Sequence, residues 1–424
     1  MLWHSGRCLP LVLASSLFIS SFAQKSESPK SQEQSDSSAE AYLIEETVES
    51  FAFENDGSSA REHRSRIRIQ SDAGVQRYGV LSFSYQKAFD TLDIDYVRVR
   101  KADGTVITTP LEEAQDMPSA IAREAPFYSD LREKHVPVKG LGTETILEYQ
   151  CHWRQKPIVP GHFFLGYFFN RDEIVLRQEL QVSIPRDRAV KMSTPELAPA
   201  TAENGGWRTY TWSRANPAPQ KVMKLDLAQL AIRGQLPAPD VELSTFHSWD
   251  EVAKWYDQLQ QERVAPTAEI RQKAAEITRT AANEDAKIRA IYRYVSTEYR
   301  YIGVALGMGR YQPHFASEVL NNGYGDCKDK HTLLAALLNA AGVPAYPALI
   351  NTSRALNEEV PSPAQFDHVI TVVPREKENL WLDTTLEVGP LGYLAPTLRN
   401  KPALVVLHGA TSGPAENTRG PAVT

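Results

Sequence analysis

In Gly325-Asp326-Cys327-Lys328-Asp329-Lys330-His331, a cysteine stands just ahead of the apolar run 332–341. Asp326 is a good N-cap, because its carboxylate can accept hydrogen bonds from the amides of a first helical turn. Leucines recur at helical spacing through the run, and Gly342 can take the left-handed conformation that ends a helix. The sequence therefore predicts a buried helix that begins at Cys327.

The predicted position of Cys327 favours chemistry at its sulfur. Unpaired amides and the helix dipole in a first turn stabilise a thiolate. Lys328 and Lys330 would act in the same direction, whereas Asp326 and Asp329 oppose them. The helix alone is therefore not sufficient, and a basic partner is needed.

A predicted hairpin downstream supplies that partner. The apolar run 368–373 is followed by a turn-like segment, 374–379, and by a second strand pattern over 380–385. We expect Val373 to lie opposite Leu380. A slip of one residue would move every side chain to the other face, so the interpretation depends on this register.

In that register His368 and Asp383 are diagonal neighbours on one face, with Cα atoms about 7–8 Å apart. Our hypothesis is a catalytic triad. Cys327 attacks a carbonyl, His368 takes and returns the proton, and Asp383 orients the imidazole.

The oxyanion donors are only partly defined by the sequence. The backbone N–H of Cys327 is one natural donor. Tyr301, Gln312 and Tyr324 are all candidates for the second, and nothing in the sequence separates them. No metal site or cofactor is expected: His331 follows one helical turn after Cys327, but no second cysteine pair accompanies it.

Three motifs resemble the transglutaminase-like cysteine domain: Gly-Asp-Cys-Lys-Asp-Lys at 325–330, Phe-Asp-His-Val at 366–369 and Trp-Leu-Asp-Thr-Thr at 381–385. The resemblance implies a papain-type arrangement of a cysteine helix and His/Asp strands, with helices packed on an antiparallel sheet. The segments 244–249 and 301–303 are similar to exported bacterial proteins in which a β-sandwich of the DUF3857 type precedes this domain. The resemblance covers about residues 40 to 400.

The residues themselves support an α+β protein with an N-terminal β-sandwich over 41–236. From 41 to about 214 the apolar residues alternate with period two, and Asp103-Gly104 has the composition of a hairpin turn. The stretch 112–137 interrupts this pattern and is expected to be a long excursion with a helical turn. The aromatic segment 163–169 is interpreted as a strand buried on both faces, rather than as an exposed recognition patch.

After Pro237-Ala238-Pro239 the pattern becomes helical. Ser248 and Glu251 form a capping box, and further helices are expected near 267–281 and 283–299. We therefore place a transglutaminase-like α+β domain at 240–400.

The remaining segments indicate export to the periplasm or cell surface. Residues 1–23 have the pattern of a signal peptide, 24–40 of a disordered tether and 409–424 of an unstructured tail. The apolar run 9–22 is shorter than the roughly 20 residues that a membrane span needs, so no stable transmembrane anchor is expected.

The composition argues against nucleic acid as a partner. A net charge of −6 and a pI near 6.0 give no indication of nucleic-acid binding. Arg-x-Arg alternations such as Arg64, Arg66 and Arg68 are typical of a solvated sheet face.

Cys151 lies on the apolar face of a predicted strand and is expected to be a buried, inert thiol rather than a disulfide partner of Cys327.

Together these features predict an exported, thiol-dependent acyl-transfer enzyme with a protein or peptide substrate. A thioester at Cys327 would be resolved by water, giving hydrolysis or deamidation, or by an amine, giving transamidation. The alternative is a non-catalytic module in which the β domain binds an envelope protein and the cysteine domain is a scaffold.

Overall fold

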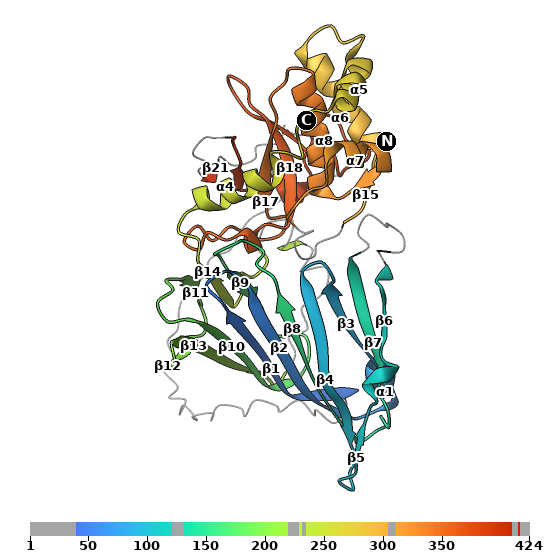
Figure 1. Ribbon diagram of the computed structural model, residues 1–424, viewed down its shortest axis with the longest axis vertical. Helices are drawn as coiled ribbons and strands as arrows, with labels where there is room; N and C mark the ends of the chain where they lie inside the picture. The colour runs from blue at the N-terminus through green and yellow to red at the C-terminus, as the bar shows by residue number, and fades with distance from the viewer. Residues whose placement is uncertain are drawn as a thin grey trace, which may run out of the picture. The chain divides into compact units, whose positions relative to one another are not determined.

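The computed structural model describes residues 40–120, 122, 130–218, 229–230, 235–303, 311–408 and 414–415 (Figure 1). The expected signal peptide at 1–23 lies outside the described residues, as does the tether at 24–40 except for Glu40. None of the helices in the described ranges is long and apolar enough to cross a membrane.

The N-terminal region is built on an eight-stranded sheet with the order β12-β13-β10-β1-β2-β8-β4-β5. Its neighbours are antiparallel except β1 and β10, which are parallel. The strands are β1 Tyr42–Phe53, β2 Ser59–Ile69, β4 Asp90–Arg100, β5 Val106–Thr108, β8 Ile146–Gln155, β10 Val175–Pro185, β12 Ala200–Asn204 and β13 Trp207–Asn216.

Two three-stranded sheets complete the predicted sandwich. One has the order β3-β7-β6, and its Leu81 and Phe83 pack on Val97 and Leu147 of the large sheet. The other has the order β11-β14-β9, and its Leu243 shares a buried cluster with β10 and β13. The elements are helix α1 Asp72–Tyr78 and strands β3 Val80–Gln86, β6 Gln115–Pro118, β7 Leu131–Pro137, β9 Phe164–Tyr167, β11 Lys191–Ser193 and β14 Val241–Ser244.

Local signals account for several of these elements. The Asp103-Gly104 turn joins β4 to β5, with Gly104 at a φ of +87°. The arginine alternation is a solvated face: Arg66 Nε donates to Glu45 at 2.6 Å, and Arg98 Nε to Glu148 at 2.7 Å.

Two expectations for this region need correction. The stretch 112–137 does contain part of a 3₁₀ turn, Leu111–Glu113, but its described residues also include the strands β6 and β7, which the sequence did not predict. The segment 163–169 is not buried on both faces, because β9 covers only part of it and Phe168 is 41% exposed. Sequence hydrophobicity could not show which of its aromatic rings meet solvent.

The C-terminal region packs helices on an antiparallel five-stranded sheet with the order β19-β18-β17-β20-β21. Its elements are helices α4 Trp249–Gln260, α5 Ala268–Thr278, α6 Glu284–Glu298, α7 Ala316–Asn322 and α8 Cys327–Ala340, and strands β15 Arg300–Tyr301, β16 Tyr324–Gly325, β17 Tyr346–Ile350, β18 His368–Val373, β19 Leu380–Leu382, β20 Ala403–Val405 and β21 Pro414–Ala415. The predicted α+β class is confirmed.

Helix α8 is the centre of this region. Its leucines are fully buried with residues of α5, α6 and α7 on one side and with Val373 and Leu382 of the sheet on the other. It ends as predicted, with Gly342 at a φ of +84°. The expectation of an unstructured tail is wrong at Pro414–Ala415, which pair with β20; the rest of 409–424 lies outside the described residues.

Candidate active site

Cys327 is the first residue of α8, as the sequence predicts. Asp326 Oδ1 accepts a hydrogen bond from Asp329 N at 3.1 Å, and Asp329 Oδ2 accepts from Asp326 N at 3.5 Å. This reciprocal capping box fixes the first turn. Gly325 allows the approach, because a Cβ at this position would lie 2.6 Å from Asp329 Cβ.

The two lysines beside Cys327 differ in their contacts. Lys328 Nζ donates to Asp326 Oδ2 in a buried ion pair, yet Lys328 lines the cavity with Cys327. Burial would lower the pKa of Lys328, but neighbouring groups, Asp326 foremost and Cys327 among them, outweigh it and raise the pKa. Lys330 Nζ donates to the carbonyl oxygens of Ser296 and Tyr299, and burial lowers its pKa to about 8. Lys330 is therefore engaged away from the sulfur, because a buried charge requires partners of its own.

Asp329, which we expected to oppose a thiolate, is also engaged. Its Oδ1 accepts from His314 N at 2.8 Å, and both of its oxygens lie 3.1 Å from His314 Nδ1. Burial would raise the pKa of Asp329, but His314 and Lys328 outweigh it and lower the pKa. His314 thus has a structural contact to the cysteine helix.

The predicted hairpin register is confirmed. Val373 pairs with Leu380 and Thr371 with Leu382. His368 Nε2 consequently lies 3.1 Å from Asp383 Oδ2, and both side chains are buried.

A further set of contacts orients the carboxylate of Asp383. Its Oδ1 accepts from Thr385 N at 2.9 Å and from Thr385 Oγ1 at 2.7 Å. Oδ2 is thereby directed to the imidazole of His368. The arrangement matches the orienting role of the third member in a nucleophile–base–carboxylate triad.

The electrostatics of the pair favour a protonated imidazole. Burial lowers the pKa of His368, but the Asp383 carboxylate and contact with the Cys327 thiol outweigh it and hold the pKa well above 6.5. Burial also raises the pKa of Asp383, and His368 outweighs it and lowers the pKa. Opposite charges in a low-dielectric site account for both directions.

Cys327 and His368 line the same cavity, which has a volume of about 40 Å³. Since Asp383 engages Nε2, the other ring nitrogen, Nδ1, is available to the sulfur. The space holds only about three or four waters at roughly 10–15 Å³ of accessible volume each. Aromatic and aliphatic side chains form most of the remaining wall, among them Tyr311, Leu349, Phe366 and Val369.

The structure does not bring the three predicted oxyanion donors into this cavity. Tyr301 is 37% exposed, although burial of its hydroxyl and the nearby Cys327 raise its pKa. The amide oxygen of Gln312 accepts from Arg263 Nε at 3.1 Å. Tyr324 places its ring 5.9 Å from the guanidinium of Arg300.

One hydroxyl that the sequence did not lead us to expect does line the cavity, that of Tyr256 of α4. Its hydroxyl is fully buried and has no hydrogen-bond partner among the described residues. Burial and then the neighbouring Cys327 raise its pKa. In the sequence, Tyr256 lies on the apolar stripe of a helix, which gives no sign that its hydroxyl faces a cysteine.

His331 is a core residue. Its Nδ1 lies 2.7 Å from Thr371 Oγ1 and its Nε2 lies 3.0 Å from Gln260 Nε2, while burial lowers its pKa to about 3. Within the described ranges, no three His, Cys, Asp or Glu side chains are grouped to hold a metal ion.

The two described cysteines differ in environment. Both are free, but Cys151 is buried and burial raises its pKa to about 12, whereas Cys327 is partly exposed. The interpretation of Cys151 as a buried thiol outside a disulfide is confirmed.

Comparison with known proteins agrees with this geometry. Residues 271–373 match the transglutaminase-like superfamily. Residues 55–221 match a second family model, the domain of unknown function DUF3857. The two matches occur in the order that the sequence motifs suggested, and the first contains Cys327 and His368. No curated protein has significant sequence similarity to the chain.

One solved structure shares the fold over most of the chain. It is described as a "putative protease" from Parabacteroides distasonis, with a TM-score of 0.74 at 18% identity, covering 89% of this chain and 72% of that one. An M1 zinc metallopeptidase from Deinococcus radiodurans matches with a TM-score of only 0.25 at 9% identity, over 48% of this chain and 42% of its own. The first likeness supports the fold, and the second carries no argument.

Proposed function

We propose that Cys327, His368 and Asp383 are the catalytic triad of a thiol-dependent acyl-transfer enzyme that acts on an amide of a protein or peptide. The observation that carries the proposal is the 3.1 Å contact between His368 Nε2 and Asp383 Oδ2, which leaves the opposite ring edge for Cys327. The transglutaminase-like match supports the same chemistry.

The first half-reaction forms a thioester. The thiol proton of Cys327 passes to His368, which gives a thiolate beside an imidazolium, and the sulfur of this thiolate attacks the carbonyl carbon. His368 returns the proton to the leaving nitrogen as the C–N bond breaks. Water or an amine then attacks the thioester carbon and gives a proton to His368, and the C–S bond breaks to release the sulfur of Cys327. Water gives hydrolysis or deamidation, and an amine gives transamidation.

The developing oxyanion has two donors in this proposal. One is the backbone N–H of Cys327 at the start of α8, where the helix leaves amides without an intrahelical acceptor. The other is the hydroxyl of Tyr256, which replaces the three donors expected from the sequence. A buried hydroxyl without a partner costs about 1–3 kcal/mol. A substrate oxygen in the cavity would provide the missing acceptor.

The electrostatics support the proton transfer. Asp383 keeps the imidazolium of His368 stable inside the protein, so the proton can remain on His368 while the sulfur reacts. The ion pairs of Asp326 and Asp329 satisfy these carboxylates elsewhere and reduce their opposition to a thiolate.

Three assays on one protein preparation test the proposal and distinguish the acceptors. Dansylcadaverine incorporation into dimethylcasein reports transamidation, ammonia release from casein reports deamidation, and new peptide termini report hydrolysis. We expect at least one product with the full chain and with Cys151→Ala, and none with Cys327→Ala. Equal product from the full chain and Cys327→Ala in every assay would refute a thiol mechanism.

Export to the periplasm or cell surface remains part of the proposal. It rests on the sequence of residues 1–23 and is checked by cell fractionation of the full chain against a variant without this segment.

A further inference from the structure

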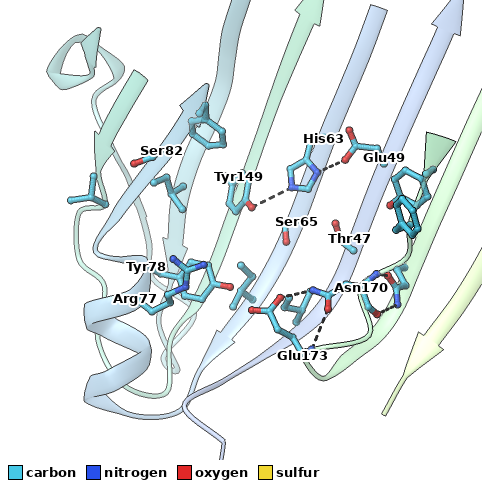
Figure 2. Close-up of a pocket in the computed structure, with 18 residues that line it drawn as sticks. Thr47, Glu49, His63, Ser65, Arg77, Tyr78, Ser82, Tyr149, Asn170 and Glu173 are labelled. Atoms are coloured by element: carbon cyan, nitrogen blue, oxygen red, sulfur yellow. Dashed lines mark hydrogen bonds and ion pairs between the residues drawn. The ribbon is translucent and has the colours of Figure 1, made fainter. Parts of the chain in front are cut away.

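A cleft of about 440 Å³ lies in the N-terminal region, and it shares no lining residue with the cavity at Cys327. Strands β1, β2 and β8 form one side, and α1 and β3 form the other (Figure 2). Its volume falls within the roughly 300–1,000 Å³ typical of small-molecule sites. Neither matching family description assigns it a function.

One part of the cleft is a fixed polar chain. His63 Nδ1 lies 2.7 Å from Glu49 Oε2, and His63 Nε2 lies 3.2 Å from the hydroxyl of Tyr149. Arg61 donates to the other oxygen of Glu49. The buried carboxylate is thus already compensated, and burial, which would raise its pKa, is outweighed by His63 and Arg61, which lower it. These groups are held in place before any ligand arrives.

A second polar group, Asn170 and Glu173, lies at the other end of the cleft, beyond Ser65 and Thr47 in Figure 2. Glu173 accepts from the Asn170 side chain and from the hydroxyl of Tyr42. The backbone of Asn170 is fixed in turn by Gln178, whose side chain donates to Asn170 O and accepts from Asn170 N, each at 2.8 Å. In these contacts the carboxylate of Glu173 therefore accepts hydrogen bonds only from uncharged groups.

Between these two groups the wall carries hydroxyls and aromatic rings. Ser65 and Thr47 lie between them in Figure 2, and Tyr78 faces the same space from α1. Phe168 also lines the cleft and is 41% exposed. This is the aromatic segment that the sequence placed inside a doubly buried strand.

The charges select among ligand classes. An anion would meet the carboxylates of Glu49 and Glu173, and Arg77 is the lining cation available to it among the described residues. A cation would find Glu49 already paired with Arg61, and it would meet the guanidinium of Arg77 in the same lining as Glu173. An uncharged ligand rich in hydroxyls meets neither penalty: its hydroxyls can donate to carboxylates and accept from amides, while its apolar ring faces lie on aromatic side chains.

We propose that this cleft binds an uncharged saccharide of a few sugar units. The polar groups at its two ends fix the sugar hydroxyls, and the aromatic wall takes the ring faces. Binding here is independent of the thiol chemistry, so Cys327→Ala should bind saccharide as the full chain does.

The test is titration calorimetry on the full chain with maltotriose, cellotriose and tri-N-acetylchitotriose, and with spermidine and inorganic phosphate as charged probes. Thr47→Phe fills the cleft from a half-buried position, and Thr91→Phe places the same ring on an exposed position of β4 outside it. Glu173→Gln keeps the shape but removes a charge. Circular dichroism melting curves identify any variant that does not fold.

We expect at least one trisaccharide to bind with a Kd of about 1 mM or lower. Thr47→Phe should weaken that binding at least about tenfold, Glu173→Gln should weaken it measurably, and Thr91→Phe should not change it. Binding of spermidine or phosphate without any saccharide would overturn the proposal. So would the absence of binding by all three trisaccharides, or saccharide binding that a folded Thr47→Phe variant retains.

Discussion

His368 Nε2 lies 3.1 Å from Asp383 Oδ2, so the pairing of β18 with β19 determines which edge of the imidazole faces Cys327. The two strands join the proposed base and its orienting carboxylate in one local unit. The proposed nucleophile comes from a separate element, α8. Reactivity at Cys327 therefore depends on how the hairpin packs against the cysteine helix. Substitutions in the hairpin and in the helix can test these two elements separately.

Alkylation should distinguish the two cysteines. We expect iodoacetamide to label Cys327 much faster than Cys151, because Cys151 is buried and burial raises its pKa to about 12. His368→Ala should slow labelling at Cys327 and, if general acid–base catalysis is lost, reduce turnover about 10²–10⁴-fold. Mass spectrometry of a labelling time course gives both rates. Equal rates at the two cysteines in the folded protein would contradict this prediction.

Tyr256→Phe should separate stability from activity. The substitution removes a buried hydroxyl that has no partner among the described residues, so the free energy of unfolding should stay the same or rise by about 1 kcal/mol. Loss of one oxyanion donor should lower kcat about 10²–10³-fold. Urea unfolding and the assay that detects product supply the two readouts.

Tyr393→Phe is the matched control for that substitution, since it removes a tyrosine hydroxyl outside the cavity, on a ring that contacts the guanidinium of Arg399. It should leave kcat within about twofold. A Tyr256→Phe variant with normal kcat would remove Tyr256 from the oxyanion site.

The pH dependence of stability should show the His368–Asp383 pair. Because the pKa of His368 is higher in the folded protein than its ordinary value of 6.5, protonated His368 stabilises the fold fully at a pH below 6.5. This contribution is lost as the pH rises through the raised pKa. Because the pKa of Asp383 is lower in the folded protein than its ordinary value of 3.8, ionised Asp383 stabilises the fold fully at a pH above 3.8. This contribution is lost as the pH falls through the lowered pKa. The combined contribution is therefore largest between pH 3.8 and 6.5.

We expect Asp383→Asn to cost about 3 kcal/mol in that window, because it leaves a buried imidazole without its charge partner. The difference from the unsubstituted protein should shrink as the pH rises above 6.5. Urea unfolding across the pH range measures it. A difference that is constant with pH would show that the pair does not titrate as described.

Gly325→Ala should destabilise the start of α8. The new methyl group would lie 2.6 Å from Asp329 Cβ, a distance that side chains cannot tolerate without movement of the helix. We expect a loss of about 1–3 kcal/mol and slower alkylation of Cys327. Gly142→Ala is the control, because no atom lies within 4 Å of the added carbon. Equal melting temperatures for the two variants would contradict the steric argument.

Local patterns explain what the sequence could predict. The cap at Asp326, the glycine at 342 and the alternation of the two strands act over a few residues, so α8 and the hairpin register followed from them. Tyr256 could not be found in this way, because its place beside Cys327 results from packing of α4, which is remote in sequence.

The lysine contacts were equally hidden from the sequence. The sequence predicted that Lys328 and Lys330 both act on the sulfur, whereas hydrogen bonding directs the ammonium group of Lys330 to two carbonyl oxygens of another segment. A linear pattern gives the sign of a charge but not the acceptor that it meets in the folded chain.

The structural role of Lys330 affects how the motif around Cys327 should be interpreted in other proteins. Its ammonium group joins α8 to the C-terminal end of α6 by donating to Ser296 O and Tyr299 O, carbonyls that the helix leaves without an intrahelical partner. Selection on folding alone would therefore preserve the lysines and aspartates around position 327. A homologue could keep all of them, replace only the cysteine and retain the same architecture. Within this motif, the residue at 327 is therefore the one whose identity bears on the proposed thiol chemistry rather than on folding.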